Sequence, residues 1–181
     1  MKLLSYAEAL SFYGSDHRLK KALAEKTIFK IADGVYCDES NPPEPAVICF
    51  AYPSAVITML SAFYIHGFTD TIPETTDIAI NSSGRAPNAK NARIYYSPKG
   101  FHDQGEMTLD VHGFPITVYS KERMLIELLR NKDSLPYDLY KEVLSNYRRI
   151  IASLDLRWIE DCLMGFPKQR LILRRLEEEV L

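Results

Sequence analysis

The chain of 181 residues has few cysteines, a single tryptophan and no long uninterrupted apolar run. Its three cysteines, Cys37, Cys49 and Cys162, form neither a Cys-x-x-Cys pair nor a His/Cys cluster, which argues against a zinc site. The most apolar stretch, residues 47–64, contains Pro53 and polar residues and is too short to span a membrane. We therefore expect a protein with reduced thiols in the cytoplasm, with no membrane contact, no metal and no cofactor.

Motifs of the common enzyme classes are also missing. The polar segment 81–90 has one glycine and no Gly-Lys-Ser/Thr, so it is a poor phosphate-binding loop. Ser61 lacks the Gly-x-Ser-x-Gly elbow of serine hydrolases and falls inside a predicted helix. These absences lead us to expect that the protein is not an enzyme.

The net charge of −2 does not indicate nucleic-acid binding, but its distribution is uneven. Residues 1–36 hold six Lys/Arg against four Asp/Glu, whereas residues 37–120 hold four against nine. A mildly basic head thus precedes an acidic middle. A difference of this size is common on solvated surfaces, so it favours DNA binding only weakly.

Two short helices are predicted at the start of the chain. Lys2–Phe12 has apolar residues at helical spacing, and Gly14 supplies a left-handed end to that helix. Ser15 is a favourable N-cap for a second helix over Asp16–Glu25, whose acidic first residue suits the helix dipole. Apolar residues of the second helix fall on one narrow stripe.

The second helix carries four potentially cationic residues away from this stripe: His17, Arg18, Lys20 and Lys21. A helix of this kind suits the major groove of DNA, where cations meet phosphates and base edges. A surface helix with solvated lysines explains the same pattern. The residues after this helix favour the first interpretation.

A tight hairpin is predicted directly after the second helix. Thr27–Ile31 and Val35–Cys37 are β-prone, and Ala32-Asp33-Gly34 supplies the turn between them. Helix, turn, basic helix and hairpin is the order of a winged helix-turn-helix, which we assign to residues 1–40. The residues expected to contact DNA are Ser15, His17, Arg18, Lys20, Lys21, Lys26 and Lys30.

The remainder predicts a mixed domain over residues 46–181. Asn41–Pro45 is proline-rich and is the expected linker, Ala46–Tyr52 is a helix or a buried strand, and a helix is expected from Pro53 to about Tyr64. Strands are expected over residues 76–81, 93–96, 108–111 and 116–119. A helix is expected to begin at about residue 121. Three more helices are expected after it, over residues 137–154, 156–164 and 168–180. The expected fold class is α+β, with an N-terminal winged helix-turn-helix and an all-helical C-terminal tail.

Three segments resemble the AbiEi family of antitoxins. Residues 21–36 are similar to the winged-helix head of that family, and residues 52–73 are similar to its most specific motif, with Phe68 where leucine is usual. Residues 119–129 resemble a third motif, in which Met124 and Glu127 replace threonine and aspartate. Because the usual threonine and aspartate are absent here, we expect that these polar residues are not strictly needed for the chemistry of this protein. The resemblance assigns no role to the positions that match the middle motif, and we expect their role to be structural. They are Tyr52, Pro53, Ser61, His66, Gly67, Thr69, Asp70 and Pro73.

The resemblance implies a transcriptional autorepressor and antitoxin of a type IV toxin–antitoxin (abortive-infection) system. Its N-terminal domain would bind inverted repeats in the promoter of its own operon, as a pair of copies on double-stranded DNA. Its C-terminal domain would counter a nucleotidyltransferase-like toxin without forming a stable complex with it.

Two alternatives remain open from the residues. The winged helix can serve as a protein-interaction adaptor without specific DNA binding, as the acidic middle and the modest basic charge allow. An enzyme acting on nucleic acid would use the turn with His66 and Asp70 or a carboxylate set. Backbone capping in that turn and an exposed acidic loop are the simpler interpretations of these groups. The set comprises His102, Asp103, Glu106 and Asp110.

Overall fold

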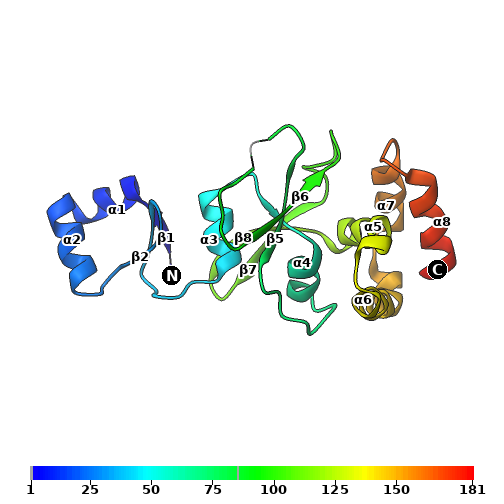
Figure 1. Cartoon of the computed structure of the whole chain (residues 1–181), viewed down its shortest axis with the longest axis horizontal. Helices are drawn as coiled ribbons and strands as arrows, with labels where there is room; N and C mark the ends of the chain where they lie inside the picture. Colours follow the sequence, from blue (N-terminus) through cyan, green and yellow to red (C-terminus); the bar gives the residue numbers. More distant parts are fainter. Residues whose placement is uncertain (1, 85) are drawn as a thin grey trace. The chain divides into compact units, whose positions relative to one another are not determined.

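The computed structural model describes residues 2–84 and 86–181, which fall into two compact units. Unit 1 comprises Met1–Pro53 and Thr108–Ile116, and unit 2 comprises Ser54–Met107 and Thr117–Leu181. The chain contains helices and two sheets, so the expected α+β class is confirmed (Figure 1).

Unit 1 begins with a small antiparallel sheet and two helices. Strands β1 (Leu3–Ser5), β2 (Phe29–Ala32) and β3 (Val35–Cys37) pair in the order β1-β3-β2. Helices α1 (Tyr6–Tyr13) and α2 (Asp16–Ala24) lie beside this sheet (Figure 1). Their shared apolar core consists of Ala9, Leu19, Ala22, Ile28 and Tyr36.

The first helix starts later than the sequence predicts. Residues Leu3–Ser5 form β1, so the expected helix over Lys2–Phe12 was wrong at its beginning. Ser5 and Glu8 form a capping box, in which the Ser5 Oγ accepts from the Glu8 amide and the Glu8 carboxylate accepts from the Ser5 amide. Ser5 is extended, as the box requires, and Leu3–Ser5 pair antiparallel with β3, which makes them a strand.

The proline-rich segment is not wholly a linker. Helix α3 (Glu44–Ala51) begins inside the expected linker Asn41–Pro45, with Pro45 in its first turn. The first amides of a helix have no intrahelical partner, so proline costs nothing there. The residues from Ala46, expected as a helix or a buried strand, therefore belong to a helix.

A five-stranded mixed sheet follows, in the order β6-β5-β4-β8-β7. It contains β4 (Val56–Ile57), β5 (Thr76–Asn81), β6 (Ala92–Ser97), β7 (Glu106–Val111) and β8 (Phe114–Tyr119). Strand β4 runs parallel to β8 and antiparallel to β5, and β5 runs parallel to β6. The four strands expected from alternation are present.

Strand β4 replaces the first turns of a predicted helix. Helix α4 covers only Met59–Ile65, so the expected start at Pro53 was wrong. The β-branched residues of β4 pair with both neighbouring strands. The helix begins after them because the buried Asp77 carboxylate accepts from the Leu60 amide at 2.9 Å, which satisfies one of its first amides.

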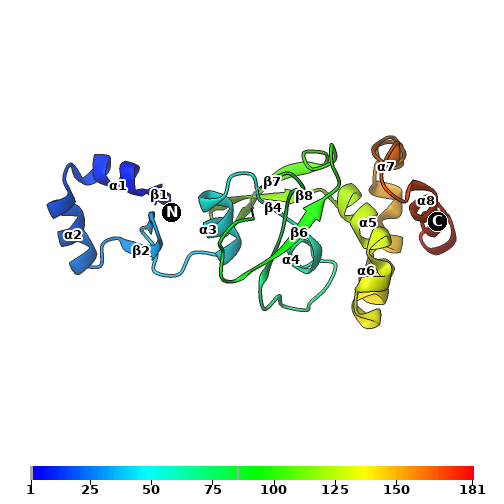
Figure 2. The ribbon, with the colours of Figure 1, turned by 45° about the horizontal axis from the view of Figure 1, so that its top comes forward.

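Helices gather at the C-terminal end of unit 2 (Figure 2). They are α5 (Lys121–Arg130), α6 (Tyr137–Ile150), α7 (Leu156–Leu163) and α8 (Gln169–Glu179), with short 3₁₀ turns at Lys132–Ser134 and Ile151–Ser153. This agrees with the helices expected there. Across residues 2–84 and 86–181, no helix has the length and apolar character needed to cross a bilayer.

Candidate nucleic-acid interface

Helix α2 presents its cationic side chains outward from a well-defined start. Ser15 is the N-cap, and its Oγ accepts from the Arg18 amide at 3.3 Å. Leu19 and Ala22 are buried in the core of unit 1, which fixes the rotation of the helix. The cationic residues of α2 are consequently exposed: His17, Arg18, Lys20 and Lys21.

Both lysines of α2 lie close to carboxylates one turn away. The Lys20 ammonium is 2.7 Å from the Asp16 carboxylate, and the Lys21 ammonium is 3.7 Å from that of Glu25. The hydrogen bond from Lys20 lowers the pKa of Asp16, and the same bond raises the pKa of Lys20. Exposed pairs of this kind contribute little to stability, so they can exchange for phosphate contacts.

Two further lysines were expected near the sugar-phosphate backbone. Lys26 is exposed in the turn after α2, where its φ of 56° is left-handed. Lys30 is exposed on β2, with its ammonium 3.5 Å from the Asp33 carboxylate of the hairpin turn. All seven residues expected to contact DNA thus lie in unit 1, with Ser15 at the helix cap and the other six individually exposed.

The middle motif of the resemblance forms a turn with specific contacts. Gly67, with φ of 73°, follows α4 and lets the chain reverse. The His66 Nε2 lies 2.7 Å from the Tyr119 carbonyl oxygen at the end of β8, and burial lowers the pKa of this imidazole. Phe68 is buried and stacks on Tyr147 with ring centroids 4.1 Å apart.

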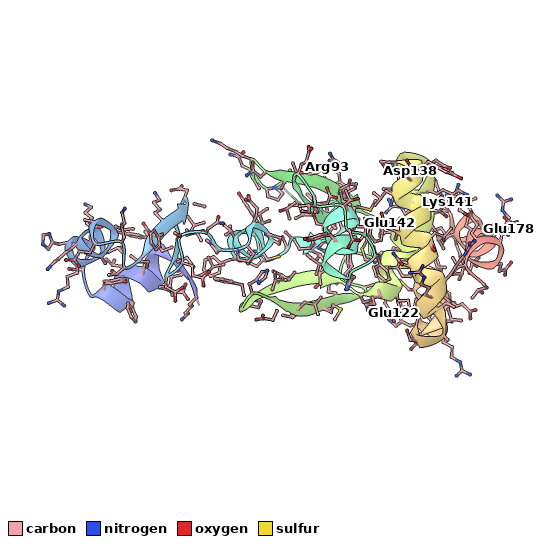
Figure 3. The ribbon with its side chains drawn as sticks, turned by 90° about the horizontal axis from the view of Figure 1, so that it is seen from below. Arg93, Glu122, Asp138, Lys141, Glu142 and Glu178 are labelled. Atoms are coloured by element: carbon pink, nitrogen blue, oxygen red, sulfur yellow. The ribbon has the colours of Figure 1, made fainter. Side chains whose placement is uncertain are left out.

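Glu142 lies on α6 (Figure 3) and forms hydrogen bonds with the end of this turn. Its carboxylate accepts from the Thr69 hydroxyl at 2.8 Å and from the Asp70 amide at 3.3 Å. The Asn146 side chain, one turn further along α6, donates to the Phe68 carbonyl at 2.8 Å. These contacts attach the turn to α6 through the Thr69 hydroxyl and the backbone of Phe68 and Asp70.

The other motif positions lie at the end of α3, inside α4 or before β5. Ser61 is buried on α4, and its hydroxyl accepts from the Asp77 amide at 2.8 Å. Tyr52 ends α3, Pro53 follows it, and Pro73 is half-buried before β5. Tyr52 and Pro53 belong to unit 1, whereas the remaining motif residues belong to unit 2.

The expected carboxylate set is only partly assembled. Potential ligand atoms of His102, Asp103 and Glu106 lie within 4.8 Å of one another. However, the His102 Nε2 donates to the Ser54 carbonyl oxygen at 2.9 Å, so this nitrogen carries a proton and has no lone pair for a cation. Asp110 is engaged elsewhere, because its carboxylate accepts from the Gly113 amide in the turn between β7 and β8.

A buried ion-pair network on α5 was missed from the sequence. The Arg123 side chain is 0% exposed and that of Glu127 is 6% exposed, and Arg123 donates to the Glu127 carboxylate through Nε and Nη2. Its Nη1 donates to the carbonyl oxygens of Phe101 and Gln104. The spacing of four residues between arginine and glutamate was the available signal, but nothing in it indicated burial.

Glu127 has further side-chain partners near the end of the same helix. Its Oε2 also accepts from Arg130 at 3.0 Å and from Asn131 at 3.1 Å. The glutamate keeps the charge of the aspartate that is usual in this motif and has a longer side chain. The expectation that the usual threonine and aspartate are not strictly needed stays a prediction. Met124 is buried and accepts a weak hydrogen bond from Thr58.

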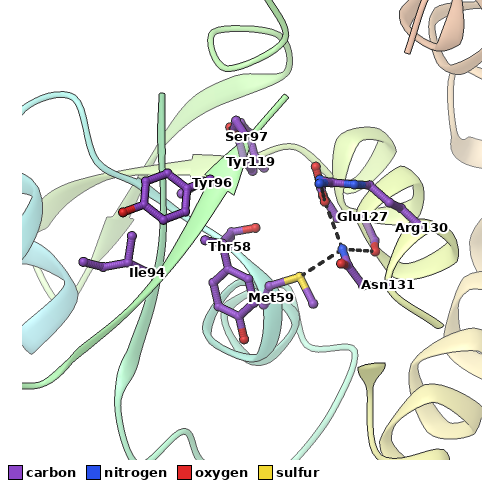
Figure 4. Close-up of a pocket in the computed structure, with 11 residues that line it drawn as sticks. Thr58, Met59, Ile94, Tyr96, Ser97, Tyr119, Glu127, Arg130 and Asn131 are labelled. Atoms are coloured by element: carbon purple, nitrogen blue, oxygen red, sulfur yellow. Dashed lines mark hydrogen bonds and ion pairs between the residues drawn. The ribbon is translucent and has the colours of Figure 1, made fainter. Parts of the chain in front are cut away.

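A cavity of about 210 Å³ lies beside this network, between β6 and α5 (Figure 4). The Glu127, Arg130 and Asn131 side chains on its wall bond to one another. Burial raises the pKa of Tyr119, another wall residue, to about 12, and its hydroxyl donates to the His102 carbonyl. The polar groups of the cavity are thus largely used by internal contacts. Its lining residues are Thr58, Met59, Ala79, Ile94, Tyr95, Tyr96, Ser97, Tyr119, Glu127, Arg130 and Asn131.

Comparisons with known proteins give a fold but no family. No family model matches the chain, and no curated protein is a significant match. Among solved structures, the chain is similar to the RV2827C protein from Mycobacterium tuberculosis, with 14% sequence identity and a TM-score of 0.69. The alignment covers 98% of this chain and 72% of that protein. At this identity the likeness shows a shared fold alone.

Proposed function

We propose that this protein is a DNA-binding transcriptional autorepressor that contacts operator repeats through unit 1. The observation that carries the proposal is α2, a helix anchored by Leu19 and Ala22 whose cationic side chains all face outward. It is joined to α1 through the Gly14 turn and followed by the β2–β3 hairpin. This is the element order of a winged helix-turn-helix, whose second helix enters the major groove.

The charge around α2 supports phosphate contacts. Residues 15–33 contain five Lys/Arg and three Asp/Glu, so the segment has a net charge of +2 within a chain of net charge −2. Cations that exchange a nearby carboxylate for a phosphate give up a weak, solvent-screened pair. Binding is then driven by counterion release and depends steeply on salt.

A gel-shift titration with the promoter DNA of its own operon tests the proposal. The variant Arg18→Ala/Lys20→Ala/Lys21→Ala should lose at least about tenfold in affinity. The slope of its log affinity against log salt should become less steep by up to about three. The matched control Arg157→Ala/Arg170→Ala/Arg174→Ala removes as many exposed charges from α7 and α8 and should bind like wild type. Equal binding by all three proteins would refute this interface.

The antitoxin half of the proposal rests on the resemblance to the AbiEi family in residues 52–73 and 119–129. We propose that unit 2 counters a nucleotidyltransferase-like toxin in the cytoplasm without a stable complex. Co-expression with such a protein encoded next to this gene tests it. The triple-alanine variant of α2 should still restore growth, because the change lies in unit 1, and the two proteins should elute separately in gel filtration. Failure to restore growth by the wild-type chain would overturn this half.

One observation favours the adaptor alternative. Lys20, Lys21 and Lys30 each have a carboxylate within 4.0 Å, which lowers the positive potential that DNA would meet. An adaptor would show no measurable affinity for promoter DNA at physiological salt and would co-purify with the product of a neighbouring gene. The same titration therefore separates the two functions.

A further inference from the structure

The cations of α2 fall into two groups in the structure. Lys20 and Lys21 lie within ion-pair distance of Asp16 and Glu25. For Arg18, by contrast, the described part of the chain contains no ion pair and no acceptor for its guanidinium. Arg18 is thus the cation of α2 that keeps its full set of donors available.

The surroundings of Arg18 keep its side chain exposed but its backbone fixed. Its amide donates to the Ser15 cap, and the next residue, Leu19, is 1% exposed in the core. A Cβ built at Gly14 would lie 3.7 Å from the Arg18 Nη1, so the guanidinium rests over the Gly14 backbone and meets no side chain there. The start of the side chain is thus fixed on α2, and its charged end is exposed.

Asp16, the acidic neighbour of Arg18, already has partners within the protein. The Asp16 carboxylate accepts from the Lys20 ammonium at 2.7 Å and from the Tyr6 hydroxyl at 3.3 Å. A base would have to displace one of these donors before the carboxylate could accept from the amino group of cytosine. Of Asp16 and Arg18, the guanidinium is the group with no partner to displace, and the exposed His17 imidazole shares this turn.

Chemistry then separates the two groups of cations. A guanidinium is a planar fork whose paired donors match the O6 and N7 acceptors of guanine, whereas an ammonium acts as a point charge toward phosphate. Residues near the N-terminal end of a helix in the major groove are the ones that reach base edges.

We propose that Arg18 determines sequence specificity by reading a guanine in the major groove, while Lys20 and Lys21 supply sequence-independent affinity through phosphates. This inference rests on the proposed DNA-binding function. It goes further by naming the base and by dividing the roles of residues on the same helix.

Selection of duplexes from a randomised 30-base-pair pool, at about 0.15 M salt, tests the division. We expect the wild-type chain to enrich a motif with a guanine at a fixed position of each half-site. Arg18→Ala should lose about 5- to 150-fold discrimination at that position and retain the rest of the motif. Lys21→Ala should enrich the same motif with weaker binding throughout.

Arg18→Gln makes the test independent of folding defects. Glutamine pairs with the N6 and N7 of adenine, so this variant should change the preferred base at that position from guanine to adenine. A change of preference cannot come from partial unfolding. If Arg18→Ala and Arg18→Gln both enrich the wild-type motif unchanged, the role of Arg18 is refuted and DNA binding stands. If the wild-type chain enriches no motif, the proposed function itself fails.

Discussion

Arg18 and Arg123 occupy the same position in two helices and have opposite surroundings. Each is the third residue after a serine N-cap, and each donates its amide to that serine at 3.3 Å. Arg18 is exposed on α2, whereas Arg123 is fully buried on α5, where its side chain meets Glu127 and two backbone carbonyls. Local sequence sets the start of both helices, and only the tertiary surroundings decide what each arginine does.

The difference teaches how to distinguish a binding charge from a structural one. A buried guanidinium that fills its donors internally cannot leave its partners without a large loss of stability. An exposed guanidinium without an ion pair can be removed at little cost to folding and is available to a ligand. Substitutions in the two units test this contrast, beginning with the largest expected effect.

Arg123→Ala should lower the free energy of unfolding by about 3–5 kcal/mol, because it leaves the Glu127 carboxylate buried with fewer donors. Arg18→Ala should change it by less than about 0.5 kcal/mol. Urea unfolding followed by circular dichroism measures both values. Similar losses for the two variants would show that the contrast in burial has no energetic meaning.

Gly105→Ala should destabilise the fold by about 1–3 kcal/mol more than Gly100→Ala. Both glycines have φ of 82°, so the backbone strain of the substitution is shared. A Cβ at Gly105 would lie 2.6 Å from the Arg123 Cβ, whereas a Cβ at Gly100 meets nothing within 4 Å. Thermal unfolding of the two variants isolates the steric term, and equal melting temperatures would contradict the close packing over Arg123.

Stability should fall as the pH drops below the ordinary pKa of histidine, in part because of His66. Burial holds the pKa of folded His66 below its ordinary value of 6.5. Its contribution is therefore complete above that value and is lost as the pH falls through the folded pKa. His66→Gln should show a smaller difference in unfolding free energy between pH values of about 7.5 and 5.5. His17→Gln controls for the loss of one histidine, and an unchanged pH difference in His66→Gln would contradict the prediction.

Asp16→Asn should leave stability almost unchanged, because the pair with Lys20 is exposed. The same change should increase affinity for promoter DNA, since it releases the Lys20 ammonium and removes a negative charge from α2. The slope of log affinity against log salt should stay close to that of wild type, because Lys20 contacts phosphate in both complexes. Gel-shift titration across salt concentrations measures this slope, and weaker binding by Asp16→Asn would argue against α2 as the interface.

Much of the fold follows from the sequence because its signals are local. Alternation predicts the strands over residues 76–81 and 116–119, and the Ser15 cap with its apolar stripe predicts α2. Strand β1 was missed although the capping box of Ser5 and Glu8 marks where α1 begins. Strand β4 was missed because two residues are too few for a period, and it is defined by its pairing with β5 and β8.

The buried network on α5 was not predictable from neighbouring residues. The stripe of leucines predicted one apolar face, but residues 123–129 are buried all round. A charged residue is tolerated there because the carbonyl oxygens of Phe101 and Gln104, about twenty residues away in the sequence, meet the guanidinium. By contrast, the exposed cations of α2 were identified directly, since a solvated residue needs no distant partner.

The Arg123 contacts also have a consequence for local opening. Because the guanidinium bonds to Glu127 and to the carbonyls of Phe101 and Gln104, the segment between β6 and β7 cannot lift away without stranding a buried charge. Groups that must separate together exchange their amide protons together. The protected amides of α5 and of this segment should therefore report one shared opening free energy in hydrogen exchange, so that an outwardly irregular segment has the protection of a core helix.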